Sequence, residues 1–308
     1  MCIATTTITE AYRQCQAQLL EAGLLISLGV PGIYGHSGAF EGVIENFEHY
    51  VTRRAKPLKA EVIRFPAIFS RKHYLQTTHI ESFPDLMGSV HSFTGNELDH
   101  VKMLQKRASG EDWTKDLNPT DVMLTPAACY PLYPTATGTL PEGGRLVDLR
   151  SFVFRHEPSI DPARMQIFRQ REFVRLGTAE QAQEHQRSWL ELGQDILKTV
   201  GLEVESVVAS DPFFGRGGKM MAATQKEQDL KFELVHAVAT AEKPTAITSC
   251  NYHLDHFGHT FDIRSADGAF AHTSCIGFGL ERIALALFMT HGFDTDTWPS
   301  DVKNVLAL

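Results

Sequence analysis

The residues best suited to chemistry lie in two separate segments and are mostly basic. The first, 151–177, reads SFVFRHEPSIDPARMQIFRQREFVRLG, and the second, 275–285, reads CIGFGLERIAL. Arg155 and Glu157 end a strand-like run two residues apart, so on a strand they share one face. Arg282 begins a predicted helix, where free N–H groups favour anions. Guanidinium groups from two distant segments predict a polyphosphate clamp, in which bidentate geometry favours arginine.

The nearby carboxylate has two candidate roles. Glu157 could hold Mg²⁺ or accept a hydrogen bond from an adenine amino group. Each residue alone also has an ordinary explanation, an ion pair for Arg155 and Glu157 and a helix-start charge for Glu281 and Arg282. The two strand-like runs are joined by a long loop, not by the two-residue turn of a compact hairpin. The long loop favours the binding of a ligand between the two strand-like runs.

Composition excludes several classes of protein. The chain of 308 residues is 43% apolar and 21% charged, which is typical of a globular protein with a sizeable core. A formal net charge of -8 argues against general nucleic-acid binding but allows a local basic pocket. The N-terminal residues lack a secretory pattern, and no run approaches the roughly 18 apolar residues that span a bilayer. We therefore expect a soluble, cytoplasmic protein.

The five cysteines are Cys2, Cys15, Cys129, Cys250 and Cys275. An odd number without a signal peptide argues against a disulfide framework, and no CxxC pair indicates a zinc ribbon. Isolated cysteines are most often small buried apolar residues.

Hydrophobic spacing predicts an α+β fold. Apolar periodicity and end signals predict helices at 7–27, from about 39, at 178–201 and from about 280. The sequence GHSG at 35–38 lacks the Lys-Ser/Thr ending of a phosphate loop and indicates a turn before a helix cap. Strand-like runs separated by hairpins, with few βαβ crossovers, predict a mainly antiparallel sheet flanked by helices.

Three segments together resemble the motifs of class II aminoacyl-tRNA synthetases. FRHE, its loop and RQREF resemble motif 2; GFGLERIALAL resembles motif 3; and AEVIRFPAIFS, around Pro66, resembles motif 1. ITSCNYHLDHFG is similar to the ISSC region of seryl-tRNA synthetases. The motifs occur in the right order over residues 55–308, so the resemblance implies the class II catalytic fold.

Two departures make the sequence more similar to a narrower family. A seryl-tRNA synthetase has a long coiled-coil arm, yet only about 55 residues precede motif 1 here, without a long heptad pattern. Cys129 stands where those enzymes carry a glutamate. The pattern resembles the amino acid:[carrier protein] ligases, truncated homologues of the atypical zinc-dependent seryl enzymes. That family activates glycine or alanine with ATP as an aminoacyl-adenylate. It then transfers the aminoacyl group to the phosphopantetheine thiol of a carrier protein.

The resemblance also implies a zinc site. The family binds zinc through Cys–Glu–Cys, and the matching positions are Cys129, Glu172 and Cys275. Three protein ligands leave the fourth position of a tetrahedral zinc open for the neutral α-amine of the amino acid. Asp211 could contact that amine, with turn capping an equal alternative. Cys250 is expected to remain a core residue.

The resemblance further implies an ATP site. Arg155 would hold the α-phosphate and stabilise the charge of the pentavalent transition state. Glu157 would read the adenine edge and Phe173 would stack on the adenine, while Arg282 packs on its other face and reaches the γ-phosphate. Mg²⁺ is expected with ATP, and its ligands are unassigned. Ala246 replaces a carboxylate that contacts metal in the seryl enzymes.

The remaining expectations concern the docking of a carrier protein, the domain organisation and the oligomeric state. Arg216 and Lys219 precede a predicted helix and offer a basic docking edge for an acidic carrier, with a solvated charged face as the alternative. We expect one catalytic domain over 1–308, with 1–55 as an extension, no tRNA-binding arm, and a homodimer through motif 1. A minimal serine-type aminoacyl-tRNA synthetase and a non-catalytic paralogue that binds adenylate or amino acid are the rival functions. Glycine and alanine both remain open, as does the identity of the carrier.

Overall fold

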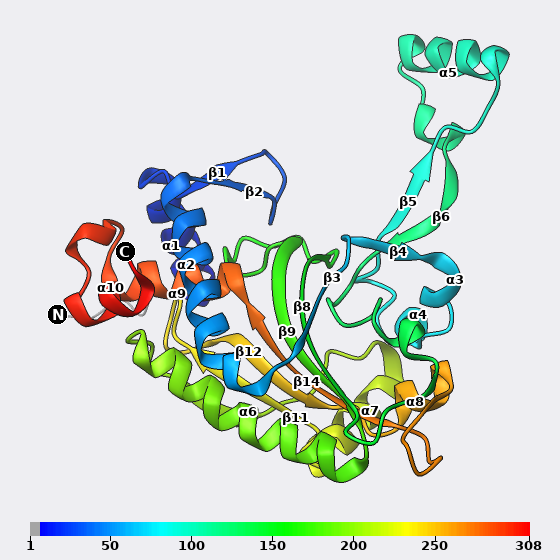
Figure 1. Ribbon diagram of the computed structural model, residues 1–308. Coiled ribbons are helices and arrows are strands. Elements are labelled where there is room, and N and C mark those ends of the chain that lie inside the picture. Colours follow the sequence, from blue (N-terminus) through cyan, green and yellow to red (C-terminus); the bar gives the residue numbers. More distant parts are fainter. Residues whose placement is uncertain (1–6) are drawn as a thin grey trace.

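A seven-stranded sheet forms the centre of the protein in a computed structural model that describes residues 7–308 (Figure 1). In spatial order its strands are β10 (Glu205–Val208), β11 (Lys231–His236), β12 (Thr245–Tyr252), β14 (His272–Gly279), β9 (Ile167–Gly177), β8 (Arg145–Phe154) and β3 (Glu61–Arg64). Neighbours are antiparallel except β3 and β8, which run parallel. The predicted α+β class is confirmed. Cys2 and the first six residues of the expected extension lie outside the described residues.

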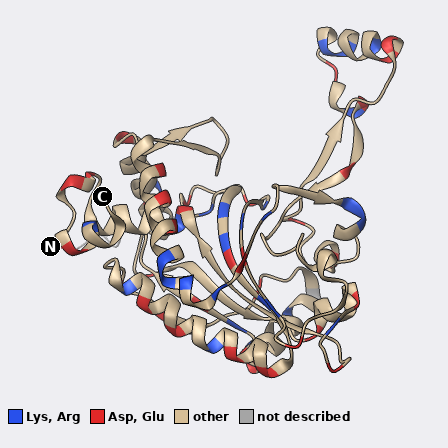
Figure 2. Cartoon of the chain, in the orientation of Figure 1, with Lys and Arg blue, Asp and Glu red and all other residues tan. Residues whose placement is uncertain are grey.

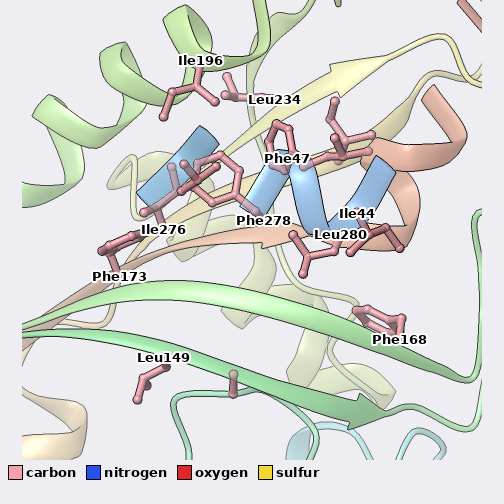
Figure 3. Close-up of a cluster of buried hydrophobic side chains, with 14 of the residues drawn as sticks. Ile44, Phe47, Leu149, Phe168, Phe173, Ile196, Leu234, Ile276, Phe278 and Leu280 are labelled. Carbon is pink, nitrogen blue, oxygen red and sulfur yellow. The ribbon is translucent and has the colours of Figure 1, made fainter. Parts of the chain in front are cut away.

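Three helices cover one face of this sheet: α2 (Gly38–Ala55), α6 (Ala179–Thr199) and α9 (Leu280–His291). The capping box of Thr178 and Gln181 starts α6, as its sequence predicts. Aromatic rings join helices to sheet, with ring centroids 4.3 Å apart for Phe173 and Trp189 and 6.0 Å for Phe47 and Phe278. Figure 3 shows Phe47, Phe173 and Phe278 in this buried cluster. The main core therefore lies between the sheet and these helices.

The N-terminal segment adds a helix and a short hairpin. Helix α1 (Ile8–Glu21) is shorter than predicted because Gly23, at φ +67°, turns the chain into β1 (Leu25–Ser27), which pairs with β2 (Tyr34–His36). The Ser37 side chain accepts a hydrogen bond from the Phe40 N–H and caps α2, so the predicted cap is confirmed. The predicted turn before it is wrong, because Gly35 and His36 belong to strand β2.

An arm that the sequence analysis did not predict projects from the body (Figure 1). Its three-stranded sheet consists of β4 (Ile68–Ser70), β6 (Asn118–Leu124) and β5 (Ser89–Ser92), with α5 (Glu97–Ser109) at the tip. No residue of α5 is buried. The ends of α5 are nevertheless marked in the sequence, because Asn96 and Asp99 form a capping box and Gly110, at φ +77°, ends the helix.

The remaining helices and short strands lie around the sheet (Figure 1). They are α3 (Arg71–Tyr74), α4 (His79–Ser82), β7 (Gly138–Thr139), α7 (Gly215–Glu227), α8 (His256–Phe261), β13 (Ile263–Arg264) and α10 (Ser300–Leu306). Arg216 and Lys219 lie inside α7, not ahead of it as predicted. Among the described residues, no helix has the length and apolar character needed to cross a membrane.

Two arginines of β9, Arg169 and Arg171, bind carboxylates of neighbouring elements. Arg169 Nε donates to Glu281 Oε1 at 2.7 Å, and Arg171 Nη2 donates to Asp148 Oδ2 at 2.7 Å. Figure 2 shows basic positions on the central strands, whereas α6 carries acidic and basic residues along its length. These buried pairs link β9 to α9 and β8, so two of the five arginines in residues 151–177 have a structural role.

Candidate active site

The sheet face opposite α6 lines a cavity of about 630 Å³. Successive side chains of a strand point to opposite faces, and the lining positions of β9 and β14 follow this rule. The residues that these two strands contribute are Phe168, Gln170, Glu172, Cys275, Gly277 and Gly279. One face of the sheet thus builds the core and the other builds the site.

Cys129, Glu172 and Cys275 converge in this cavity. One ligand atom from each, the two Sγ atoms and a carboxylate oxygen, lies within 4.8 Å of the others, and all three residues are buried. Cys129 comes from the irregular segment after β6, whereas Glu172 and Cys275 come from the paired strands β9 and β14. The structure therefore brings together the three residues for which the resemblance implied a metal site.

The electrostatics of this cluster favour a bound cation. Glu172 Oε1 accepts a hydrogen bond from the Ala128 N–H at 3.1 Å, and the buried Oε2 has no hydrogen-bond partner among residues 7–308. Burial and the nearby Cys275 raise the pKa of Glu172 to about 8. The hydrogen bond to Cys275, together with burial, raises the pKa of Cys129, and the same bond lowers the pKa of Cys275. Two thiolates and a carboxylate are a donor set that suits zinc, with one tetrahedral position left open.

Two further side chains orient Cys275. Asn251 Nδ2 donates to Cys275 Sγ at 3.4 Å, and His253 Nε2 lies 3.7 Å from the same sulfur. His253 Nδ1 lies 3.0 Å from Thr273 Oγ1, which fixes the ring. Hydrogen bonds of this kind hold metal ligands in position. Neither residue was predicted from the sequence, although Asn251 and Cys275 become neighbours once β12 pairs with β14.

Arg155 and Arg282 line the same cavity as unneutralised cations. Arg155 Nε donates to the Pro126 carbonyl at 3.1 Å, and Arg282 donates to the carbonyls of Ala163 and Ala246 at 2.8 and 2.9 Å. Neither guanidinium has an ion-pair partner within residues 7–308. Burial and the charge of Arg155 lower the pKa of Arg282 to about 10. Two guanidinium groups without ion-pair partners make this part of the cavity suited to binding an anion.

The aromatic platform of the cavity is Phe168, not Phe173. The guanidinium carbons of Arg155 and Arg282 lie 5.7 and 5.8 Å from the centroid of the Phe168 ring. Phe173 is 1% exposed and stacks on Trp189 of α6, so its predicted contact with adenine is wrong. The signal was in the sequence, because Glu172 and Phe173 are adjacent on a strand and must face opposite sides.

Glu157 also differs from the expectation. Strand β8 ends at Phe154, so Arg155 and Glu157 lie in the following loop and do not share a strand face. Arg155 lines the cavity, whereas Glu157 pairs with Arg164 and is not among the lining residues. The polar loop after Phe154 ends the regular alternation on which that expectation depended.

Asp211 and α7 form another wall of the cavity. The Asp211 carboxylate accepts hydrogen bonds from Lys231 Nζ and, at 2.9 Å, from Gln225 Nε2. Burial alone would raise the pKa of Asp211, but Lys231 and Gln225 lower it. Met220 and Met221 of α7 line the cavity although they are 73% and 47% exposed, which places α7 at its mouth. Lys219 is exposed on the same helix.

Comparison with known proteins shows the family to which the chain belongs. No protein-family model matches the chain. Amino acid–[acyl-carrier-protein] ligase 1 of Bradyrhizobium diazoefficiens is 41% identical over 287 residues, covering 92% of this chain and 88% of that protein. Ligase 2 of the same bacterium is 42% identical over 291 residues, covering 94% and 87%. The chain belongs to the amino acid–[acyl-carrier-protein] ligase family.

This member of the ligase family also resembles synthetases. The type-2 serine–tRNA ligase of Methanothermobacter thermautotrophicus is 25% identical over 264 residues, covering 82% of this chain and 52% of the relative. The M. kandleri SerRS, in its crystal structure with A. aeolicus tRNASec, has a TM-score of 0.79 at 19% identity. That match covers 95% of this chain and 60% of the synthetase. The predicted class II synthetase-like fold is confirmed.

Substitution of Phe168 should affect ATP binding, whereas substitution of Phe173 should affect stability. If Phe168 is the platform for a nucleobase, Phe168→Ala should raise the KM for ATP about tenfold, since stacking on an aromatic ring contributes roughly 1–3 kcal/mol. Phe173→Ala should instead lower the free energy of unfolding by about 3–5 kcal/mol, because it empties core volume. ATP kinetics and denaturant unfolding of both variants test this. A larger KM for Phe173→Ala than for Phe168→Ala in folded protein would contradict the assignment.

Metal binding should release protons. In the metal-free site the pKa of Glu172 is about 8 and that of Cys129 is raised, so both groups are protonated at pH 7. Ligation requires the deprotonated forms, so about two protons should leave per metal ion, and affinity should rise with pH. Calorimetry in buffers of different ionisation enthalpy measures this number. The Glu172→Gln variant should release about one proton fewer, and equal release by both proteins would contradict the ligand assignment.

Proposed function

We propose that the chain activates a small amino acid with ATP and transfers it to the phosphopantetheine thiol of an acyl-carrier protein. The observation that carries the proposal is one cavity that contains both a buried Cys–Glu–Cys cluster and two unneutralised arginines. The cluster can bind the amine of an amino acid, and the arginines can bind the phosphates of ATP. The 41–42% identical relatives support the carrier protein as acceptor, because both are named as acyl-carrier-protein ligases.

The amino acid would lie at the cluster. Cys129, Glu172 and Cys275 would hold zinc, which when bound supplies an open coordination position for a neutral α-amine. Asp211 lines the same cavity and can contact the amine once its bonds to Lys231 and Gln225 rearrange. Glycine and alanine both fit this proposal, since neither demands a polar side-chain pocket.

ATP would lie at the arginines, with Mg²⁺ bound to its phosphates. Arg155 would hold the α-phosphate, while Arg282 and Phe168 would enclose the adenine between a cation and an aromatic ring. Arg282 would also reach the γ-phosphate. For Glu157 to read the adenine edge, its carboxylate must leave Arg164.

The reaction needs no nucleophile from the chain. The carboxylate of the amino acid attacks the α-phosphorus of ATP, and pyrophosphate leaves. The carrier thiol then attacks the carbonyl of the adenylate, AMP leaves, and the thiol proton passes to solvent or to the leaving phosphate. Arg155 stabilises charge on the phosphorus centre, and the cluster orients the amino acid, so positioning and electrostatics account for catalysis.

The carrier would approach at α7. Helix α7 stands at the mouth of the cavity and contains Arg216 and the exposed Lys219. The exposed Lys219 beside exposed methionines suits an acidic partner that inserts its phosphopantetheine arm. Residues 7–55 share the main core with the sheet, which supports one catalytic unit and not a separate extension.

We further propose a homodimer formed through motif 1. Strand β3 is one edge of the large sheet, and its Val62 is 64% exposed. Val62→Lys should shift the protein to a monomer in sedimentation experiments, because a charge at an edge strand opposes pairing. Val208→Lys is the matched control, since Val208 is 43% exposed on β10, the opposite edge. A wild-type monomer, or equal dissociation in both variants, would refute the proposal.

The principal test is ATP–pyrophosphate exchange with each of the twenty amino acids, with bound metal quantified on the same sample. We expect exchange only with glycine or alanine, about one zinc per chain, and transfer to a phosphopantetheine-bearing carrier protein. Cys129→Ser and Cys275→Ser should lose metal and exchange. Cys250→Ser, in the core of the neighbouring strand β12, should keep both.

Other outcomes of this test identify the rival functions. Exchange with serine, together with charging of tRNA and not of a carrier, would identify a minimal synthetase. A folded, metal-loaded protein that shows no exchange would identify a binding paralogue. Normal exchange by Cys129→Ser would refute the metal assignment alone.

A further inference from the structure

The tip of the N-terminal hairpin binds the loop that follows Arg155. The carbonyl of Gly32, between β1 and β2, accepts a hydrogen bond from the Gln166 backbone N–H at 2.8 Å. The preceding carbonyl, that of Pro31, accepts one from the Gln166 side-chain amide, also at 2.8 Å. Gln166 is only 6% exposed. Two consecutive carbonyls therefore fix both the backbone and the side chain of one buried residue.

Gln166 in turn binds the backbone of Arg155. The Arg155 N–H donates to the Gln166 carbonyl at 2.8 Å, directly beyond the last strand pair, Phe154 with Ile167. This bond closes the two ends of the loop. A series of hydrogen bonds thus runs from the hairpin tip through Gln166 to Arg155, whose guanidinium lines the cavity.

The contact requires glycine at position 32. Gly32 has φ +77°, a conformation that side chains disfavour. A Cβ atom there would lie 3.0 Å from the Arg164 carbonyl oxygen and 3.3 Å from Gln166 Cγ. The hairpin can approach the loop this closely only because position 32 has no side chain.

The loop is held from its other side by the second cavity arginine. Arg282 Nε donates to the Ala163 carbonyl at 2.8 Å. The hairpin tip itself is otherwise exposed, with Leu28 and Val30 59% and 51% accessible, so it contributes little to the core. Its buried hydrogen bonds are directed at the loop.

We infer that Gly32 and Gln166 are positioning residues for ATP activation. The hairpin tip holds the loop so that Arg155 faces the cavity before ATP binds. Without this contact, ATP binding would have to order the loop, and the ordering cost would appear as weaker apparent affinity. The inference rests on the proposed role of Arg155 in binding ATP.

Two variants and one control test this role in the full-length, metal-loaded protein. Gln166→Leu removes the side-chain amide at similar size, and Gly32→Ala obstructs the close approach. Both should raise the KM for ATP in pyrophosphate exchange about tenfold, roughly the effect of one lost hydrogen bond. The KM for the amino acid, the metal content and the Tm should change little. Val30→Ala, at the same tip, should behave as wild type.

The outcomes separate this inference from the proposed function. An unchanged KM for ATP in Gln166→Leu, with wild-type exchange intact, overturns the positioning role alone. A parallel loss of ATP affinity, amino-acid affinity and Tm indicates a purely structural role and also overturns it. A wild-type protein without exchange overturns the proposed function, and this inference with it. If Gly32→Ala does not fold, Gln166→Leu still decides the question.

Discussion

Three acidic groups are buried together in one cavity, and the arrangement of the site depends on that constraint. A carboxylate with a buried, unpartnered oxygen and two cysteine sulfurs cannot all carry charge in a low-dielectric cavity unless a cation joins them. The fold brings these residues from three segments distant in sequence. Hydrogen bonds from Asn251 and Ala128 then orient a thiol and the carboxylate at the same point.

The two faces of the sheet explain how one set of strands provides both a core and a cavity. On β9 and β14, alternate residues face the helices and the remainder face the cavity. The buried pairs of Arg169 and Arg171 fix β9 to α9 and β8. Arg155 and Arg282 make no such pairs, so within the described chain their charge remains available to an anionic ligand.

Much of this organisation could be predicted from the sequence, for physical reasons that differ between residues. Local periodicity and caps predicted α2, α6 and α9, because their apolar faces are continuous in sequence. Motif resemblance indicated Cys129, Glu172 and Cys275, which spacing alone could not have joined. Phe173 was misassigned, although strand alternation places it opposite Glu172. Helix α5 was missed although Asn96, Asp99 and Gly110 mark its ends in the sequence, whereas the contact of Gly32 with Gln166 depends on tertiary structure.

We propose that the Cys–Glu–Cys cluster binds a metal ion, and that this ion selects the substrate through its α-amine. The most direct measurement replaces the metal with Co²⁺ and follows its visible absorption while glycine or acetate is added. The account predicts that glycine changes the spectrum with saturation, that acetate at equal concentration does not, and that Cys275→Ser shows no cobalt–thiolate spectrum of this kind. An equal response to glycine and acetate, or none to glycine or alanine in cobalt-loaded protein, would contradict it.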